Sequence, residues 1–264
     1  MIQVSVDNTF EEWRATARVL LRSNVPPDDV IWTEIGQNKL FDRESKENVL
    51  PGESRVPVGF IDLAGSAACF DDPSRWSVLY RVLYRLVNES RHLLQIESDP
   101  DVRQLNLMAK AVRRDIHKFH AFVRFRRIEW DDKEIFVAWH EPHHFTVEPA
   151  APFFARRFGS MHFSILTPKG CAHWDQKQLV FSDPVDRSLA PAADEVEDLW
   201  LLYYGSIFNP FRLNVNTMKR ELPVRHWSTL PEAALIPELI RKAAERPDGA
   251  CVFAESGQRE NKAL

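Results

Sequence analysis

The segment His140-Glu141-Pro142-His143-His144 follows the pattern H-E-x-x-H, which on a helix places two imidazoles and a glutamate base around one zinc ion. That geometry needs a helix, because a helix brings residues four positions apart onto one face. Proline inside a helix costs about 3 kcal/mol or more, and the preceding letters IFVAW are typical of a strand. In an extended chain the two outer histidines would lie ~13 Å apart at ~3.3 Å per residue, so only a sharp turn would bring them to one zinc ion. We therefore interpret the segment as a turn after a strand, and we expect no metal site.

A second group of chemically capable side chains lies at Cys171, His173 and Asp175. A His/Asp pair is suited to general acid–base catalysis, and a thiol beside an imidazole is suited to nucleophilic catalysis. No spacing rule supports either reaction. If the protein is an enzyme, its catalytic residues are expected among four histidines and one aspartate, namely His117, His120, His144, His162 and Asp175.

Basic residues are concentrated between residues 101 and 130, which contain eight Lys or Arg and three Asp or Glu. This excess of five positive charges lies in a chain whose net charge is −4. Lys and Arg neutralise the phosphates of a polyanion, and an aromatic side chain can stack on an exposed base. The alternative is a solvated helix face whose arginines pair with carboxylates elsewhere in the fold. The residues expected to contact nucleic acid are Lys110, Arg113, Arg114, Lys118, His120, Phe122, Arg124, Arg126, Arg156, Arg157 and Trp174.

Two adjoining elements are expected to position most of these residues. A helix that begins at Asp99-Pro100 and runs to about residue 118 has one apolar stripe, and the opposite face carries Arg103, Lys110, Arg114 and His117. A strand over residues 119–130 would turn alternate side chains inward. Its outward side chains would be His120, Phe122, Arg124 and Arg126.

The apolar periodicity along the chain predicts an α+β fold. It opens as β-α-β over residues 1–6, 9–23 and 29–34, and it continues with helices over 56–69, 74–97 and 99–118. A β-hairpin at 119–130 and 134–140 is followed by a helix at 149–158 and by further antiparallel strands at 161–167 and 178–182. C-terminal helices are expected at 194–206, 211–221 and 231–246. We expect one domain over 1–246, in which 36–55 form a surface loop or linker, and a flexible tail over 247–264.

The composition is that of an ordinary globular protein, with 44% hydrophobic and 27% charged residues. The sequence MIQVSVDNTFEEW at the N-terminus lacks the pattern of a signal peptide, and no apolar run approaches the ~20 residues that span a bilayer. The three cysteines are far apart and give no disulfide framework. These features predict a cytoplasmic protein without membrane contact. The nine glycines form neither G-x-G-x-x-G nor a Walker A sequence, and we expect no cofactor.

Several long stretches are distinctive as sequence motifs: 109–126 (AKAVRRDIHKFHAFVRFR), 152–158 (PFFARRF), 203–210 (YYGSIFNP) and 230–240 (LPEAALIPELI). With these stretches, nearly the whole chain resembles a bacterial family of unknown function whose members are described as DNA metabolism or DNA repair proteins. Members of that family occur alone or fused ahead of a uracil-DNA-glycosylase-like domain, and many are encoded beside a radical SAM protein. The resemblance brings no catalytic residues. His140 stands where the family pattern has an aromatic residue, so the literal zinc motif is particular to this chain.

Three hypotheses follow. In the first, the protein binds DNA in DNA repair as an accessory of a uracil-glycosylase-like or radical SAM enzyme. Its cations would hold phosphates while Phe122 or Trp174 stacks on an unpaired or flipped base. In the second, it is an enzyme that acts on nucleic acid, such as a nuclease, a lyase or a base-modifying enzyme. In the third, it is a scaffold whose basic surface meets an acidic partner protein.

Overall fold

The computed structural model describes residues 1–7, 9–34, 56–130, 133–189, 218–220, 222–230, 233 and 235–244. By its internal contacts the chain divides into two compact units, Met1–Asp194 and Glu195–Leu264, and each is considered by itself. The expected loop at 36–55, the helix at 194–206, most of the segment 211–221 and the tail at 247–264 lie outside the described residues. One domain over residues 1–246 stays a prediction.

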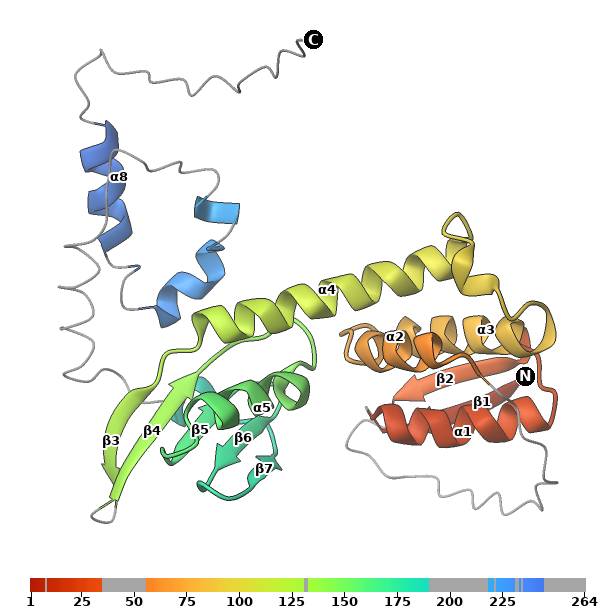
Figure 1. Ribbon diagram of the computed structural model, residues 1–264, viewed down its shortest axis with the longest axis horizontal. Coiled ribbons are helices and arrows are strands. Elements are labelled where there is room, and N and C mark those ends of the chain that lie inside the picture. The colour runs from red at the N-terminus through yellow and green to blue at the C-terminus, as the bar shows by residue number, and fades with distance from the viewer. Residues whose placement is uncertain are drawn as a thin grey trace, which may run out of the picture. The chain divides into compact units, whose positions relative to one another are not determined.

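Among the described residues, the first unit combines five α-helices with two β-sheets (Figure 1). The helices are α1 (Phe10–Arg22), α2 (Val58–Ala68), α3 (Ser74–Asn88), α4 (Pro100–Phe122) and α5 (Val147–Arg157). The strands are β1 (Ile2–Val6), β2 (Val30–Glu34), β3 (Arg126–Trp130), β4 (Lys133–Trp139), β5 (Phe163–Leu166), β6 (Cys171–Trp174) and β7 (Leu179–Ser182). The second unit contains a 3₁₀ helix (Val224–Thr229) and α8 (Ile236–Ala244). This arrangement confirms the predicted α+β class.

The chain opens with the expected β-α-β unit, in which β1 and β2 pair in parallel. Thr9 caps α1, because its hydroxyl accepts a hydrogen bond from the Glu12 amide at 3.4 Å. The Glu12 carboxylate in turn accepts from the Asp7 amide at 2.7 Å. These bonds satisfy amides that have no partner within the helix, and they fix where α1 begins.

Tryptophan side chains fill the core between α1, β2 and α3. The Trp13 ring is 1% exposed, and its centroid lies 6.2 Å from those of both Trp32 and Trp76. Around them pack the apolar residues at helical spacing that predict α3, among them Leu79, Leu83 and Leu86. Burial of this stripe, rather than intrinsic helix propensity, supplies most of the stability of α3.

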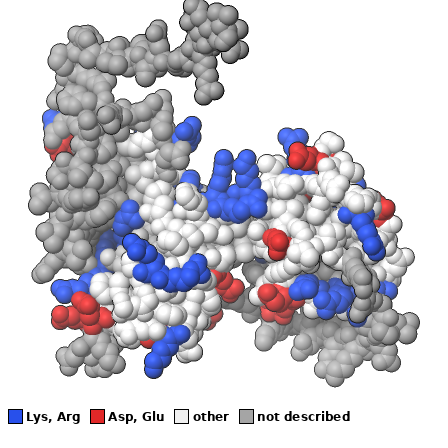
Figure 2. Space-filling model, in the orientation of Figure 1, with Lys and Arg blue, Asp and Glu red and all other residues white. Residues whose placement is uncertain are grey.

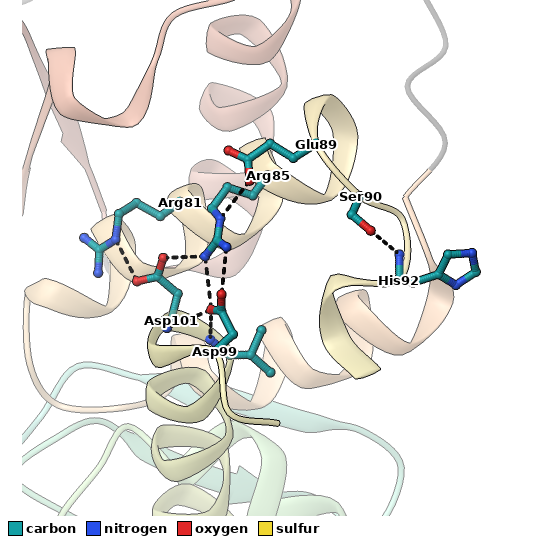
Figure 3. A network of polar contacts seen from close by, with 8 residues as sticks. Arg81, Arg85, Glu89, Ser90, His92, Asp99 and Asp101 are labelled. Carbon is teal, nitrogen blue, oxygen red and sulfur yellow. Dashed lines mark hydrogen bonds and ion pairs between the residues drawn. The ribbon is translucent and has the colours of Figure 1, made fainter. Parts of the chain in front are cut away.

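A network of charged side chains joins α3 to the start of α4 (Figure 3). Asp99 caps α4 by accepting hydrogen bonds from the Asp101 and Val102 amides at 3.0 and 3.2 Å. Its two carboxylate oxygens also accept from both terminal nitrogens of Arg85 at 3.0 and 2.7 Å. Because such bidentate pairing is directional, it fixes the angle at which α4 leaves the turn after α3.

Replacing Asp99 with alanine is expected to lower the free energy of unfolding by about 2 kcal/mol, because the cap and the Arg85 pair are lost together. The matched variant Asp99→Asn keeps the cap and loses the ion pair, so it should cost about 1 kcal/mol. Pairing with Arg85 lowers the pKa of Asp99 below its ordinary 3.8, so the contribution of the pair is present above that pH and is lost as the pH falls. Urea unfolding at pH 7 and pH 3 measures both effects. If the difference in free energy of unfolding between wild type and Asp99→Asn is the same at the two pH values, the ion pair does not contribute as predicted.

The second sheet has five strands in the order β3-β4-β5-β6-β7. The predicted hairpin is confirmed, because β3 and β4 pair antiparallel. The expectation that the following strands are all antiparallel is wrong for one pair: β4 and β5 run in parallel. The reason is that α5 forms a crossover between them and returns the chain to the starting edge. One face of the sheet packs on α5 through Phe163, Ile165 and Ala172 (Figure 1).

Helix α4 differs from the sequence prediction because it continues to Phe122 instead of ending near residue 118. Phe119 keeps the helical spacing of the apolar stripe and is fully buried in the second core cluster. At the helix end, the Arg124 guanidinium donates to the carbonyls of Ala121 and Val123 at 2.7 and 3.2 Å. The prediction that His120 and Phe122 belong to a strand is therefore wrong; both are helical.

None of the described helices is both long enough and apolar enough to cross a membrane.

Candidate nucleic-acid interface

The exposed face of α4 is a continuous stripe of basic and neutral residues. Arg103, Lys110, Arg113, Arg114 and His117 are all exposed and recur at steps of three, four and seven, which is the spacing of one helix face. From Arg103 to His117 the stripe is about 21 Å long at 1.5 Å per residue. This part of the sequence prediction agrees with the structure, and we call these five residues the α4 cationic face.

No acidic residue interrupts the α4 cationic face. The two acids of this helix lie elsewhere: Asp101 pairs with Arg81 and Arg85 in its first turn, and Asp115 is buried on the opposite side. Within the described part of the chain, Lys110, Arg113 and Arg114 form no ion pair with a carboxylate. Figure 2 shows Lys and Arg side chains gathered over the middle of α4 without an Asp or Glu among them. As far as the described residues are concerned, neutralisation by nearby carboxylates therefore does not apply to these three.

The cationic surface continues from the end of α4 onto α5. The His120 ring stacks on Phe153 of α5 at 4.2 Å between centroids, and its Nε2 donates to the Ala150 carbonyl at 3.1 Å. Burial lowers the pKa of His120, the Ala150 bond raises it, and the positive charges of His117 and Arg156 lower it further. His117 precedes His120 by one turn of α4, and Arg156 follows Phe153 by three positions on α5, so the two surfaces adjoin at the stacked His120–Phe153 pair.

The other residues expected to contact nucleic acid differ in their exposure and lie on different elements. Arg156 and Arg157 are exposed on α5, and Arg157 lies over the Phe158 ring at 5.9 Å. The Trp174 indole packs in the second core cluster and donates to the Gly159 carbonyl at 3.0 Å. Four residues are half-buried at the end of α4 or near the start of β3: Lys118, Phe122, Arg124 and Arg126. The single outward face expected for His120, Phe122, Arg124 and Arg126 is not formed, because the helix and the strand divide them.

Phe153 is a residue of this surface that the sequence prediction missed. It is 37% exposed, and it lies three and four positions before Arg156 and Arg157 on α5. The signal was present, since a helix over 149–158 places residues at these spacings on one face. It was hidden because Phe153 and Phe154 are adjacent, and the sequence does not show which of the two is buried. The structure buries Phe154, which is 2% exposed.

The five candidate catalytic residues lie at four separate places along the chain. His117 and His120 are on α4, His144 is in the loop before α5, His162 precedes β5, and Asp175 follows β6. The Asp175 carboxylate accepts from the Lys177 and Gln178 amides at 2.8 and 2.7 Å, as in an ordinary tight turn. In the described portion of the chain, no group of three or more His, Cys, Asp or Glu side chains is placed to hold a metal ion.

The H-E-x-x-H segment forms the loop between β4 and α5 rather than a helix, as its proline predicts. Buried Asp115 organises this loop: its carboxylate accepts from the His143 and His144 amides at 3.2 and 3.0 Å and from the Thr146 hydroxyl at 3.0 Å. The ring of His144 stacks on Phe70 at 4.5 Å, and its Nδ1 accepts from the Asp71 amide at 3.2 Å. The loop therefore joins the α2–α3 turn to the sheet, and sequence spacing gave no sign of this contact.

His173 on β6 bridges the two neighbouring strands. Its Nδ1 lies 2.9 Å from the Ser164 hydroxyl on β5, and its Nε2 lies 2.8 Å from the Ser182 hydroxyl on β7. Burial lowers the pKa of its imidazole. The Cys171 thiol is buried and directed at the Thr167 carbonyl at 3.9 Å. Because serines occupy both ring nitrogens, the pairs of His173 with Cys171 or Asp175 that the sequence suggested are not formed.

One protein-family model, described as domain of unknown function DUF4130, matches residues 73–232. The chain belongs to the DUF4130 family. This confirms the expectation of a family of unknown function. No curated protein and no solved structure matched the chain. The DUF4130 region contains α3, α4, α5 and the whole second sheet, so the α4 cationic face and its continuation on α5 lie inside it, whereas β1, α1 and β2 precede it.

Proposed function

We propose that this DUF4130 protein binds DNA through the α4 cationic face and its continuation on α5. The observation that carries the proposal is a helix face with four exposed Lys or Arg residues and no acid, in a chain whose net charge is −4. Since the chain as a whole would repel a polyanion, affinity must come from such a local surface. Ordered cations that displace counterions from phosphates supply most of non-specific DNA binding.

The geometry of α4 suits a phosphate backbone. Its cationic face is about 21 Å long, and the phosphates of one B-form strand repeat every ~3.4 Å along the axis, so a face of this length meets several of them. The side chains project from a rigid helix whose opposite stripe is buried, from Val102 to Phe119. Little backbone freedom is therefore lost when they bind, which favours affinity.

We propose further that the DNA-bound protein works in DNA repair, as an accessory of a uracil-DNA-glycosylase-like or radical SAM enzyme. This part rests on the family resemblance of stretches such as residues 109–126 and 152–158. Those two stretches form the C-terminal half of α4 and most of α5, so the motifs that carry the resemblance are also those that build the cationic surface.

The double variant Arg113→Ala/Arg114→Ala is expected to bind DNA roughly tenfold more weakly than wild type at fixed salt, which is about 1.4 kcal/mol. The slope of log affinity against log salt should become shallower by about 1.5, since two phosphate contacts are removed. Fluorescence anisotropy with labelled single-stranded and duplex oligonucleotides, over a series of salt concentrations, measures both quantities.

The matched control is Arg14→Ala/Arg18→Ala, which removes the same charge from exposed positions of α1. It should leave the affinity and the salt slope within a factor of two of wild type. Equal losses of DNA affinity in both double variants would show that binding depends on net charge alone and not on the α4 cationic face. No binding of wild type to any DNA would reject the proposal and favour an acidic protein partner for this surface.

A further inference from the structure

We infer that Phe153 is a stacking platform for an unpaired base, so that the surface takes single-stranded nucleic acid in preference to a closed duplex. The inference rests on the proposed function and adds the strand form to it. Phe153 lies on α5, its side chain is 37% exposed, and the residue after it, Phe154, is buried in the second core cluster.

The phenyl ring of Phe153 is held from inside the protein. The imidazole of His120 stacks on it at 4.2 Å with an interplanar angle of 25°. The ring of Phe154 meets it edge-on at 5.2 Å and 86°. His120 is itself fixed by the bond from its Nε2 to the Ala150 carbonyl at 3.1 Å. A partly exposed aromatic ring on such a support loses little freedom when another ring stacks on it.

Basic residues follow this ring on α5, and the α4 cationic face ends one turn before its stacking partner His120. Arg156 and Arg157 follow Phe153 by three and four positions on α5, and both are exposed. His117 ends the α4 cationic face one helical turn before His120, the residue that stacks on Phe153. A nucleotide whose base covers Phe153 would therefore have a flanking phosphate close to Arg156 and Arg157, which share α5 with the ring.

The cations and the Phe153 ring differ in whether they distinguish single-stranded from duplex DNA. Arg and Lys hold phosphates of a single strand and of a duplex alike. Inside a duplex a base is stacked on both faces, so it offers its ring face to a phenyl only after flipping, whereas bases of a single strand offer theirs readily. Phe153 should therefore add affinity for single strands and contribute almost nothing on a blunt duplex, whereas the α4 cationic face contributes to both.

The test compares wild type, Phe153→Ala and Phe153→Trp on a fluorescein-labelled oligo-dT strand and on a blunt duplex of equal length. Phe153→Ala should bind the single strand about tenfold more weakly, since loss of one stacked base costs on the order of five- to a hundredfold. It should bind the duplex within twofold of wild type. Phe153→Trp keeps a stacking surface and should restore single-strand affinity. Because Phe153 is partly exposed, the variants are expected to fold, which circular dichroism confirms.

The control is Val19→Ala, which removes an exposed apolar side chain from α1, 44% exposed, and should change neither affinity. If wild type binds both DNA forms and Phe153→Ala changes neither, or weakens both equally, the stacking inference is overturned while the proposed DNA binding stands. If wild type binds neither form, both are overturned. If Phe153→Ala lowers single-strand affinity and Phe153→Trp does not restore it, stacking is also rejected. The lost affinity would then come from packing of the phenyl ring within the protein.

Discussion

Replacing Asp115 with alanine is expected to lower the free energy of unfolding by about 3 kcal/mol. The Asp115 side chain is 4% exposed, and it accepts hydrogen bonds from the His143 amide, the His144 amide and the Thr146 hydroxyl. Without the carboxylate the two part-buried amides and the buried Thr146 hydroxyl lose this acceptor, and a buried group left without its partner costs about 1–3 kcal/mol before relaxation. Equilibrium urea unfolding gives the total effect, and amide hydrogen exchange at residues 143 and 144 shows whether the loop is released.

The matched control for this substitution is Asp62→Ala, which removes a carboxylate from an exposed position of α2. Its cost should stay within about 0.5 kcal/mol, as for most surface substitutions. If Asp115→Ala costs no more than Asp62→Ala, the carboxylate does not organise the loop. Faster exchange throughout the chain, rather than first at residues 143 and 144, would assign the loss to global instability.

Trp13→Ala is expected to cost about 4 kcal/mol, the largest single effect predicted for this chain. The side chain is 1% exposed, and its ring contacts Phe10, Trp32 and Trp76 at centroid distances of 5.7, 6.2 and 6.2 Å. Removing a buried tryptophan forfeits its burial and leaves a cavity between α1, β2 and α3 that close-packed neighbours cannot fill. Thermal and urea unfolding, followed by circular dichroism, measure the loss.

Trp13→Phe is the informative comparison. Among the residues that the structure describes, the indole Nε1 of Trp13 has no hydrogen-bond acceptor. Phenylalanine keeps most of the apolar surface and removes that unsatisfied donor, so its cost should be about 1 kcal/mol. A cost for Trp13→Phe close to that of Trp13→Ala would mean that shape, rather than apolar burial, dominates at this position.

The apolar periodicity predicted most helices and strands of the first unit, but it predicted some of their ends at the wrong residue. The helix expected over 74–97 ends at Asn88, where the Arg85 carbonyl accepts from both the Glu89 and the Ser90 amides. The apolar pattern does not show this end, because Leu93 in the following 3₁₀ turn is also buried, at 3% exposure. Residues 119–122 satisfied both a helical and an alternating pattern, and packing of Phe119 into the second core decided for the helix.

The candidate surface was predictable where it depended on one helix and unpredictable where it depended on tertiary contacts. Lys110, Arg114 and His117 follow from helix geometry alone. Neither the exposure of Phe153 nor the burial of Asp115 follows from local spacing, because each depends on contacts with a distant segment: Phe153 packs on His120, and Asp115 on residues 143–146. Asp115 counts in the sequence as an acid that offsets the basic stretch, yet its charge is turned toward residues 143–146 and away from the cationic face.

Helix α4 is shared by both hydrophobic clusters, with Val102 and Leu105 in the first and Phe119 in the second. During synthesis from the N-terminus, every residue of the first cluster leaves the ribosome before any strand of the second sheet exists. Since domains fold as they emerge, α4 can dock on α2 and α3 at that stage. The C-terminal turns of α4 are then already in place when β4, α5 and β5 form, and these elements can pack directly on them. Synthesis from the N-terminus therefore favours folding of the first cluster before the second.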